Sequence, residues 1–288
     1  MPKALANKLV GRNSIQMYNT KIIRSGDHIE IYKMYQYHVR DGKRSTAEVK
    51  LRKLEKNIEK DSQIFIKENT IKTDKELNKL KSRNRAKNKI LRLVRSNSDM
   101  TTFITLTFQE EPKINQAKTY LNTFFTKLRK DNKNLKYLWV LEKGDRRGRI
   151  HYHVLCNLNI KISLQKSTEK KSEAHKKLEQ EFANKYWQHG IVDIRKAHKA
   201  ENSNLALYVS TYLVKSLQNV DLDGMRIYGY SRKTLKKPTE VTYLNTKENI
   251  EDILSNFEDY RIKYQNSYQI GYENNTGHVL YLDLIKKE

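Results

Sequence analysis

The sequence predicts an α+β protein built on an antiparallel sheet, and three observations lead to this fold class. Hydrophobic residues in the middle of the chain recur with strand and helix periods in the order strand, helix, strand, strand, helix, strand. A pair of β-rich runs precedes this section and another pair follows it. The 288 residues suffice for one to two domains, and a hydrophobic fraction of 37% confines the core to part of the chain.

The central section supplies the elements of the predicted sheet. We expect strands at 103–108, 135–142, 150–158 and 191–195, and helices at 114–130, 172–187 and 204–217. Apart from the additional last helix, this order is that of the split βαβ, or ferredoxin-like, arrangement. Its expected product is an antiparallel sheet with helices packed on one face.

The segment before this section is basic and contains further elements. Residues 16–40 indicate a β-hairpin with its turn at 25–27. Residues 45–48 and 73–76 both have the form of a capping box, so each is expected to begin a helix, and the second helix should end before Asn97. The pattern alone leaves the role of this segment open.

The segment after the central section is rich in tyrosine. A short helix is expected near 249–257, and alternating residues on both sides of 274–277 indicate another hairpin. The predicted organisation is therefore an N-terminal basic region at 1–97, a central domain at 98–235 and a C-terminal extension at 236–288.

The charge of the chain favours a polyanionic partner. Lys and Arg number 57 against 33 Asp and Glu, which gives a formal net charge of +24. An excess of this size is typical of proteins that bind nucleic acid. The alternative is that the lysines reflect genome composition and lie on solvated helix faces. The sequence contains no Walker A motif, so an ATPase or helicase module is not supported.

The cysteine content and the lengths of apolar runs indicate the cellular compartment in which the protein is expected. The single cysteine, Cys156, excludes an intramolecular disulfide framework and suits a reducing cytoplasm, where it is expected to be a small buried hydrophobe. Nowhere do about 18 apolar residues follow one another, and the first residues lack the apolar core of a signal peptide. We therefore expect a soluble, cytoplasmic protein without a membrane partner.

Two histidines lie one residue apart in the run GRIHYHVL, residues 148–155. On a strand His151 and His153 point to the same face. Glu142 ends the preceding strand, and the turn between the two strands brings its carboxylate near both imidazoles. Such a set suits a divalent cation that also holds a substrate oxygen. The alternative is a pair of hydrogen-bonded histidines with a structural role.

A pair of tyrosines offers a nucleophile. Tyr208 and Tyr212 are four residues apart on one face of the predicted helix, and Lys215 follows three residues later. A phenol is a poor nucleophile at its ordinary pKa, so it needs a metal-bound phosphate and a nearby cation. The alternative places both tyrosines in the core beside Leu205 and Leu213.

In this order, FITLTF, GRIHYHVL and YVSTYLVK resemble the three motifs of the HUH endonucleases, which initiate rolling-circle replication of phages, plasmids and small single-stranded DNA replicons. The similarity is greatest to initiators with a YxxxY tyrosine pair. It covers residues 98–235, including a WxxG stretch at 187–190 and a YSR stretch at 230–232. Tyr152 stands where the family has a bulky hydrophobe.

The resemblance implies a role for each matched residue. The implied metal ligands, for Mg²⁺ or Mn²⁺, are His151, His153 and Glu142; the implied catalytic residues are Tyr212 as primary nucleophile, Tyr208 as second nucleophile and Lys215 as a stabiliser of negative charge. The implied reaction cuts single-stranded DNA at a replication origin, with a hairpin as the expected form of the origin. It leaves a 5′-phosphotyrosine and a free 3′-OH, and a host helicase and polymerase are the expected partners.

Further residues are candidates for binding the DNA. They are Arg146, Arg147 and Arg149 in the turn beside the metal strands, Thr105 and Thr107 in the first motif, and Arg232 in the YSR stretch. An exposed charged turn without this role is the alternative for the three arginines of the turn. Two other functions remain open for the whole chain: an HUH tyrosine transposase, or a non-catalytic ferredoxin-like module that binds nucleic acid.

Overall fold

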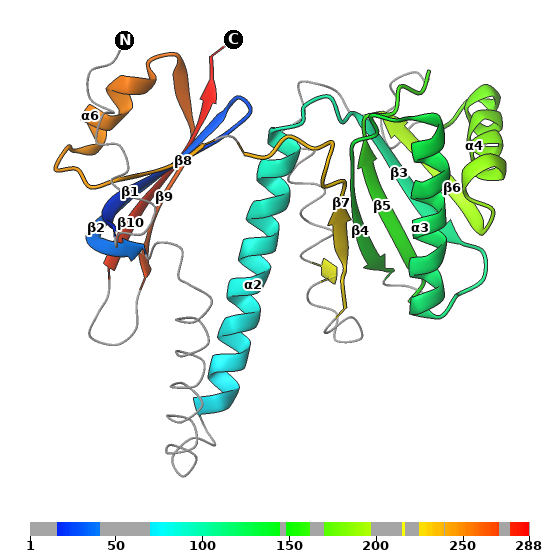
Figure 1. Ribbon diagram of the computed structural model, residues 1–288, viewed down its shortest axis with the longest axis horizontal. Coiled ribbons are helices and arrows are strands. Elements are labelled where there is room, and N and C mark those ends of the chain that lie inside the picture. Colours follow the sequence, from blue (N-terminus) through cyan, green and yellow to red (C-terminus); the bar gives the residue numbers. More distant parts are fainter. Residues whose placement is uncertain are drawn as a thin grey trace. The chain divides into compact units, whose positions relative to one another are not determined.

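The computed structural model divides into two compact units (Figure 1). One unit is Lys81–Lys237, and the other combines Met1–Leu80 with Pro238–Glu288. The structure describes residues 16–40, 70–144, 148–161, 170–196, 215–216, 225–238, 240–270 and 277–287. Within these ranges, no helix combines the length and the apolar character that crossing a membrane requires.

The central unit contains a five-stranded sheet in the order β6-β3-β5-β4-β7. Its strands are β3 (Thr102–Phe108), β4 (Tyr137–Lys143), β5 (Ile150–Cys156), β6 (Gly190–Lys196) and β7 (Tyr228–Tyr230). Every neighbouring pair is antiparallel. The order of the first four strands is that of the split βαβ arrangement, so the predicted α+β fold of ferredoxin-like type is confirmed.

Two helices follow the predicted pattern in this unit. Helix α3 (Ile114–Asp131) buries an apolar stripe that includes Leu121 and Phe124, and the ring of Phe125 stacks on Tyr137 of β4 with 3.8 Å between centroids. Helix α4 (Glu173–Tyr186) begins at the N-cap Ser172 and contacts both α3 and β6. The two helices thus pack together as the sequence predicts.

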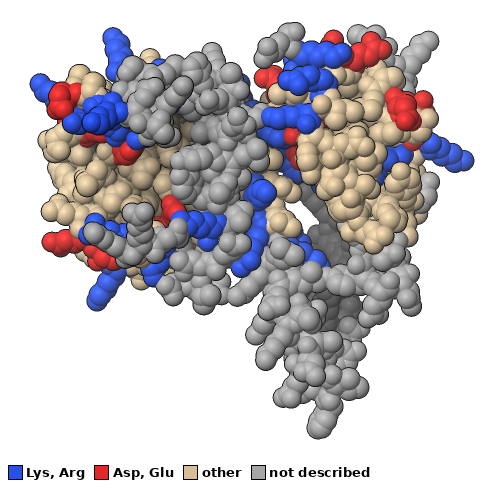
Figure 2. All heavy atoms as spheres, turned by 180° about the vertical axis from the view of Figure 1, so that it is seen from behind, with Lys and Arg blue, Asp and Glu red and all other residues tan. Residues whose placement is uncertain are grey.

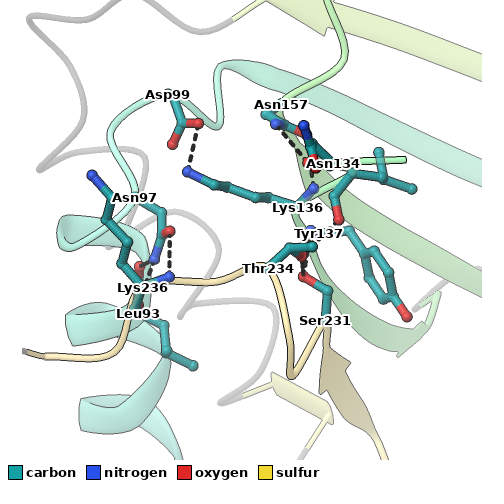
Figure 3. Close-up of polar contacts among 11 residues, drawn as sticks. Leu93, Asn97, Asp99, Asn134, Lys136, Tyr137, Asn157, Ser231, Thr234 and Lys236 are labelled. Carbon is teal, nitrogen blue, oxygen red and sulfur yellow. Dashed lines mark hydrogen bonds and ion pairs between the residues drawn. The ribbon is translucent and has the colours of Figure 1, made fainter. Parts of the chain in front are cut away.

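The end of helix α2 (Thr70–Arg95) is fixed by a polar network in the same unit (Figure 3). The side-chain amide of Asn97 donates to the carbonyls of Leu93 and Lys236, both at 2.8 Å, and its oxygen accepts from the amide of Lys236 at 2.9 Å. Ser231 and Tyr137 exchange hydrogen bonds at the start of β4. The segment after β7 is therefore tied to the helix and to the sheet. The predicted helix end before Asn97 is confirmed, whereas the helix begins at Thr70, before the capping-box pattern at 73–76 that was expected to begin it.

The other unit contains a second five-stranded sheet, in the order β8-β1-β2-β10-β9. Its strands are β1 (Gln16–Ser25), β2 (His28–Arg40), β8 (Glu240–Leu244), β9 (Tyr260–Ile270) and β10 (Gly277–Lys286). Segments from both ends of the chain thus share one sheet. One face carries a small core that includes Ile29, Ile31 and Leu282, and Ile253 of α6 (Ile250–Leu254) packs on it.

The helices and strands predicted for this unit can now be compared with the structure. Strands β1 and β2 form the expected hairpin, with the turn at Gly26–Asp27. Helix α6 starts with a capping box and continues as the short helix η4 (Ser255–Phe257), as expected near 249–257. Strands β9 and β10 pair as predicted. Their connecting turn, the helix expected from residue 45 and nearly all of the helix expected at 204–217 lie outside the described residues.

Tyr152 lies between the two histidines and points to the face that α3 covers. It is fully buried, and its ring meets Trp139 and Phe108 edge-on with centroids 5.7 and 6.2 Å away. The buried hydroxyl has no hydrogen-bond partner in the described part of the chain, and burial raises the pKa of this phenol well above its usual range. A purely apolar ring would therefore suit this position.

Replacing Tyr152 by Phe is expected to raise the free energy of unfolding by about 1 kcal/mol, because an unsatisfied buried hydroxyl is removed while the ring is kept. Urea denaturation measures the change. Tyr186→Phe is the matched control, since the hydroxyl of Tyr186 donates to Asp131 at 2.6 Å on the surface and its loss should bring no gain. A loss of stability in Tyr152→Phe would show that the hydroxyl has a partner.

Candidate metal and catalytic site

The two histidines and the glutamate meet on the sheet face opposite α3. Glu142 on β4 lies directly across from His151 on β5 in the strand register. Its carboxylate turns diagonally to His153, with 2.6 Å between Oε2 and Nε2. The other carboxylate oxygen accepts a hydrogen bond from Nζ of Lys215, also at 2.6 Å. The structure therefore brings together four residues that the sequence analysis singled out.

The neighbouring strand β3 holds both imidazoles from the other side. Thr105 lies across from His153 and Thr107 across from His151. Their hydroxyl oxygens are 3.2 and 3.0 Å from the respective Nδ1 atoms. A hydroxyl can donate or accept, so it can support either tautomer of the ring and leaves Nε2 to face the site. The hydroxyls of both threonines thus contact the histidines, and their predicted contact with DNA stays a prediction.

The electrostatics of the site keep the carboxylate charged and one imidazole neutral. Burial alone would raise the pKa of Glu142, but the hydrogen bonds from His153 and Lys215 outweigh it and lower the pKa to about 2. Burial, together with the nearby His153, lowers the pKa of His151, and the carboxylates of Glu142 and Glu111 oppose this shift only in part. A charged carboxylate and a neutral imidazole are the forms that bind a cation.

The donor chemistry of this site fits a divalent cation, although its present geometry is closed. Both oxygens of Glu142 are engaged, one by His153 and one by Lys215. As the side chains stand, no group of three or more His, Cys, Asp or Glu residues within the described ranges is arranged to hold a metal ion. A cation at Glu142 and the two histidines therefore requires that the hydrogen bond between Glu142 and His153 open.

The WxxG stretch braces Thr107, the support of His151. The buried indole of Trp187 donates to the carbonyl of Thr107 at 3.3 Å. Gly190 begins β6 so close to β3 that a Cβ atom on it would lie 2.2 Å from the same carbonyl oxygen. Only glycine allows this approach. The stretch thereby fixes the end of β3 from which Thr107 reaches the imidazole.

The structure describes only some of the remaining predicted site residues. Arg149 is half-buried directly before β5, and its carbonyl accepts from the amide of Gly144 at 2.8 Å. Arg232 is exposed after β7. The predicted residues Tyr208, Tyr212, Arg146 and Arg147 lie outside the described residues. Their roles, and DNA binding by the other candidates, stay predictions.

The sequence analysis missed Glu111. Both of its carboxylate oxygens lie 3.2 Å from the backbone amide of Ile150, the residue before His151. This contact joins the loop after β3 to the start of β5. The available signal was the acidic pair at 110–111, one residue after the predicted strand at 103–108.

Basic side chains are present on both units. On the face drawn in Figure 2, Lys and Arg lie on each unit, with Asp and Glu among them. This distribution accompanies the net charge of +24.

One comparison with known proteins is informative. Residues 101–217 match the family model described as replication-associated protein ORF2/G2P. The matched segment contains β3 to β6, both histidines, Glu142 and Lys215. The chain gives no significant match to a curated protein or to a solved structure. The family match supports a role as a replication initiator.

Proposed function

We propose that this protein is a rolling-circle replication initiator of the HUH type, which nicks and rejoins single-stranded DNA at a replication origin. One observation carries the proposal: Glu142, His151, His153 and Lys215 gather on one sheet face within the segment that matches a replication-associated family. This grouping favours a catalytic protein over a nucleic-acid-binding module without catalytic activity.

Tyr212 is the proposed nucleophile. Its phenol gives up a proton, the phenolate oxygen attacks the scissile phosphorus, and the bond from phosphorus to the 3′ oxygen breaks. The 3′ oxygen takes up a proton, which leaves a free 3′-OH and a 5′-phosphotyrosine. Tyr208 is the second nucleophile. It cuts the regenerated origin while the phosphotyrosine bond at Tyr212 persists. A host polymerase extends the 3′-OH and a host helicase opens the duplex, so both are proposed partners.

The site residues assist this reaction by their charge. His151, His153 and Glu142 would hold Mg²⁺ or Mn²⁺, which when bound supplies positive charge to the scissile phosphate. Lys215 lies at the same carboxylate, so its ammonium group can stabilise negative charge on the phenolate or the phosphate. Arg149 and Arg232, with Arg146 and Arg147, are proposed to hold the DNA backbone.

The test uses labelled single-stranded DNA of randomised sequence with Mn²⁺, followed by denaturing gels. A DNA-shifted protein band should form with the wild type, require the metal, and be lost in Tyr212→Phe and in His151→Ala. Tyr264→Phe is the control, because this tyrosine is exposed in the other unit. Loss of the band in Tyr208→Phe but not in Tyr212→Phe would reverse the two roles. Tight DNA binding without any adduct would contradict the proposal.

Replacing Thr107 by Val is expected to weaken Mn²⁺ binding about tenfold, because the hydrogen bond that orients the imidazole of His151 is lost while the side-chain shape is kept. Calorimetric titration of the protein with Mn²⁺ measures the affinity. Thr102→Val is the matched control on the same strand, since its hydroxyl donates to the carbonyl of Leu158 away from the histidines. Equal affinities in the wild type and Thr107→Val would show that this hydroxyl does not support a metal ligand.

A further inference from the structure

A pocket of about 340 Å³ lies at the end of β3, on the side of the sheet that α3 covers. Its lining comes from the loop after β3, the start of α3 and the turn before β6. The residues are Phe108, Gln109, Glu110, Glu111, Pro112, Gln116, Tyr120, Gln188 and His189. A volume of this size, in the lower range of ligand pockets, accommodates a flat heterocycle with its sugar.

The pocket is joined to the candidate site through the backbone. Phe108 directly follows Thr107, whose hydroxyl contacts His151. On the other side, the carboxylate of Glu111 accepts from the amide of Ile150, the residue before His151. The pocket and His151 therefore share one end of β3, on opposite faces of the sheet. A DNA strand that crosses this end can place a phosphate at the histidines and a nearby base at the pocket.

Aromatic rings form a fixed wall of the pocket. The rings of Tyr120 and His189 lie nearly parallel, with 3.6 Å between centroids, and His189 meets the buried Trp187 edge-on. The amide of Gln109 donates to the carbonyl of His189 at 2.9 Å, which holds the loop after β3 to the turn before β6. A rigid aromatic pair offers a π-face on which an unpaired base can stack.

The polar groups of the rim favour a hydrogen-bond donor. The amide nitrogen of Gln116 donates to the hydroxyl of Tyr120 at 2.7 Å, and that of Gln188 donates to the carbonyl of Asn184 at 3.0 Å. The carboxylates of Glu110 and Glu111 accept only, and the amide oxygens of the two glutamines can act as further acceptors. The described residues that line the pocket include neither Lys nor Arg, so the pocket suits a base better than a phosphate.

We propose that this pocket holds one unpaired nucleobase next to the scissile phosphate and selects a base with an exocyclic amino group over thymine. The inference rests on the proposed nicking function and adds a source of origin specificity to it. Carboxylate and amide oxygens accept from the amino groups of cytosine and adenine, whereas the single N–H donor of thymine, at N3, is flanked by two carbonyl oxygens that face the same acceptors. The aromatic wall supplies stacking that is independent of sequence.

The test determines which bases are preferred near the cut by sequencing the DNA strands that become attached to the protein. Wild type and the variants Gln116→Leu and Gln188→Leu react with the randomised single-stranded pool and Mn²⁺, and the attached strands are sequenced. The wild type should disfavour thymine at one position close to the cut. Each variant should reduce this bias about three- to tenfold at that position alone, the range for one lost hydrogen bond.

The control is Gln180→Leu, an exposed glutamine of α4 that also donates to the residue four positions later and lies away from the pocket. It should keep the wild-type bias. An unchanged bias in both pocket variants, or thymine enriched at the position, would overturn the inference.

A second measurement separates this inference from the nicking reaction. If the wild type forms no adduct, the proposed function fails, and binding of short labelled dA, dC and dT homopolymers in EDTA is measured by fluorescence anisotropy. The pocket should make dT the weakest ligand, and Gln116→Leu should narrow the difference. Equal affinity for the three homopolymers would contradict the proposed base preference of the pocket, independently of the nicking reaction.

Discussion

Replacing Glu142 by Gln should reduce metal-dependent adduct formation at least about 100-fold, because the substitution removes the only negative charge in the proposed ligand set of Glu142, His151 and His153. The amide keeps the size of the side chain and can still bond His153, so the fold should persist. Adduct yield is measured over a range of Mn²⁺ concentrations. A variant that reaches the wild-type yield at the wild-type metal concentration would remove Glu142 from the ligand set.

The matched control for this substitution is Glu179→Gln. Glu179 is also a buried carboxylate of the central unit with a lysine partner, and it accepts from Nζ of Lys171 and from the backbone amide of Ile194. It lies on α4, away from the histidines. Glu179→Gln is expected to lower stability and to leave the Mn²⁺ dependence unchanged, which separates loss of structure from loss of a ligand.

The same glutamate predicts a dependence of stability on pH. Its pKa in the folded protein is about 2, below the ordinary value of 4.5. A group whose folded-state pKa is lowered contributes stability above its unfolded pKa and loses it as the pH falls through the folded pKa. The difference in unfolding free energy between wild type and Glu142→Gln should therefore be constant above about pH 5 and change between pH 4.5 and 2. Urea denaturation at several pH values tests this, and a constant difference throughout would contradict it.

Local periodicity predicts much of this site. The alternation of side chains along a strand is enough to place His151 and His153 on one face, and a short turn between two strands is enough to place Glu142 across from His151. The order of the elements in the central section also predicts the topology of the sheet. These features depend on residues that are close in the sequence.

Local sequence patterns do not predict features that depend on contacts between residues far apart in the sequence. The supports Thr105 and Thr107 follow from the register between β3 and β5, more than 40 residues apart, which the sequence does not determine. The diagonal contact of Glu142 with His153 depends on rotamers rather than on register. The pairing of β1 with β8 joins residues more than 200 positions apart, so local signals could not place the two ends of the chain in one sheet.

Replacing Gly190 by Ala should lower the free energy of unfolding by about 3 kcal/mol, the upper range for overpacking in a well-packed region. The added Cβ would lie 2.2 Å from the carbonyl oxygen of Thr107 and 2.6 Å from the amide nitrogen of Gln109, so backbone must move. Urea denaturation measures the loss. Gly148→Ala is the control, because its Cβ would meet only Lys143 at 3.4 Å and its left-handed backbone, with φ +64°, costs about 1 kcal/mol.

The effect of Gly190→Ala on activity distinguishes two explanations. If the glycine only stabilises the fold, adduct formation should return to the wild-type level at a low temperature at which the variant is folded. If the close approach of β6 positions Thr107 for His151, the folded variant should still bind Mn²⁺ about tenfold more weakly, as Thr107→Val does. Because the strain falls on the carbonyl of Thr107 itself, we expect the second result, and the double variant should then be no weaker in Mn²⁺ binding than either single one.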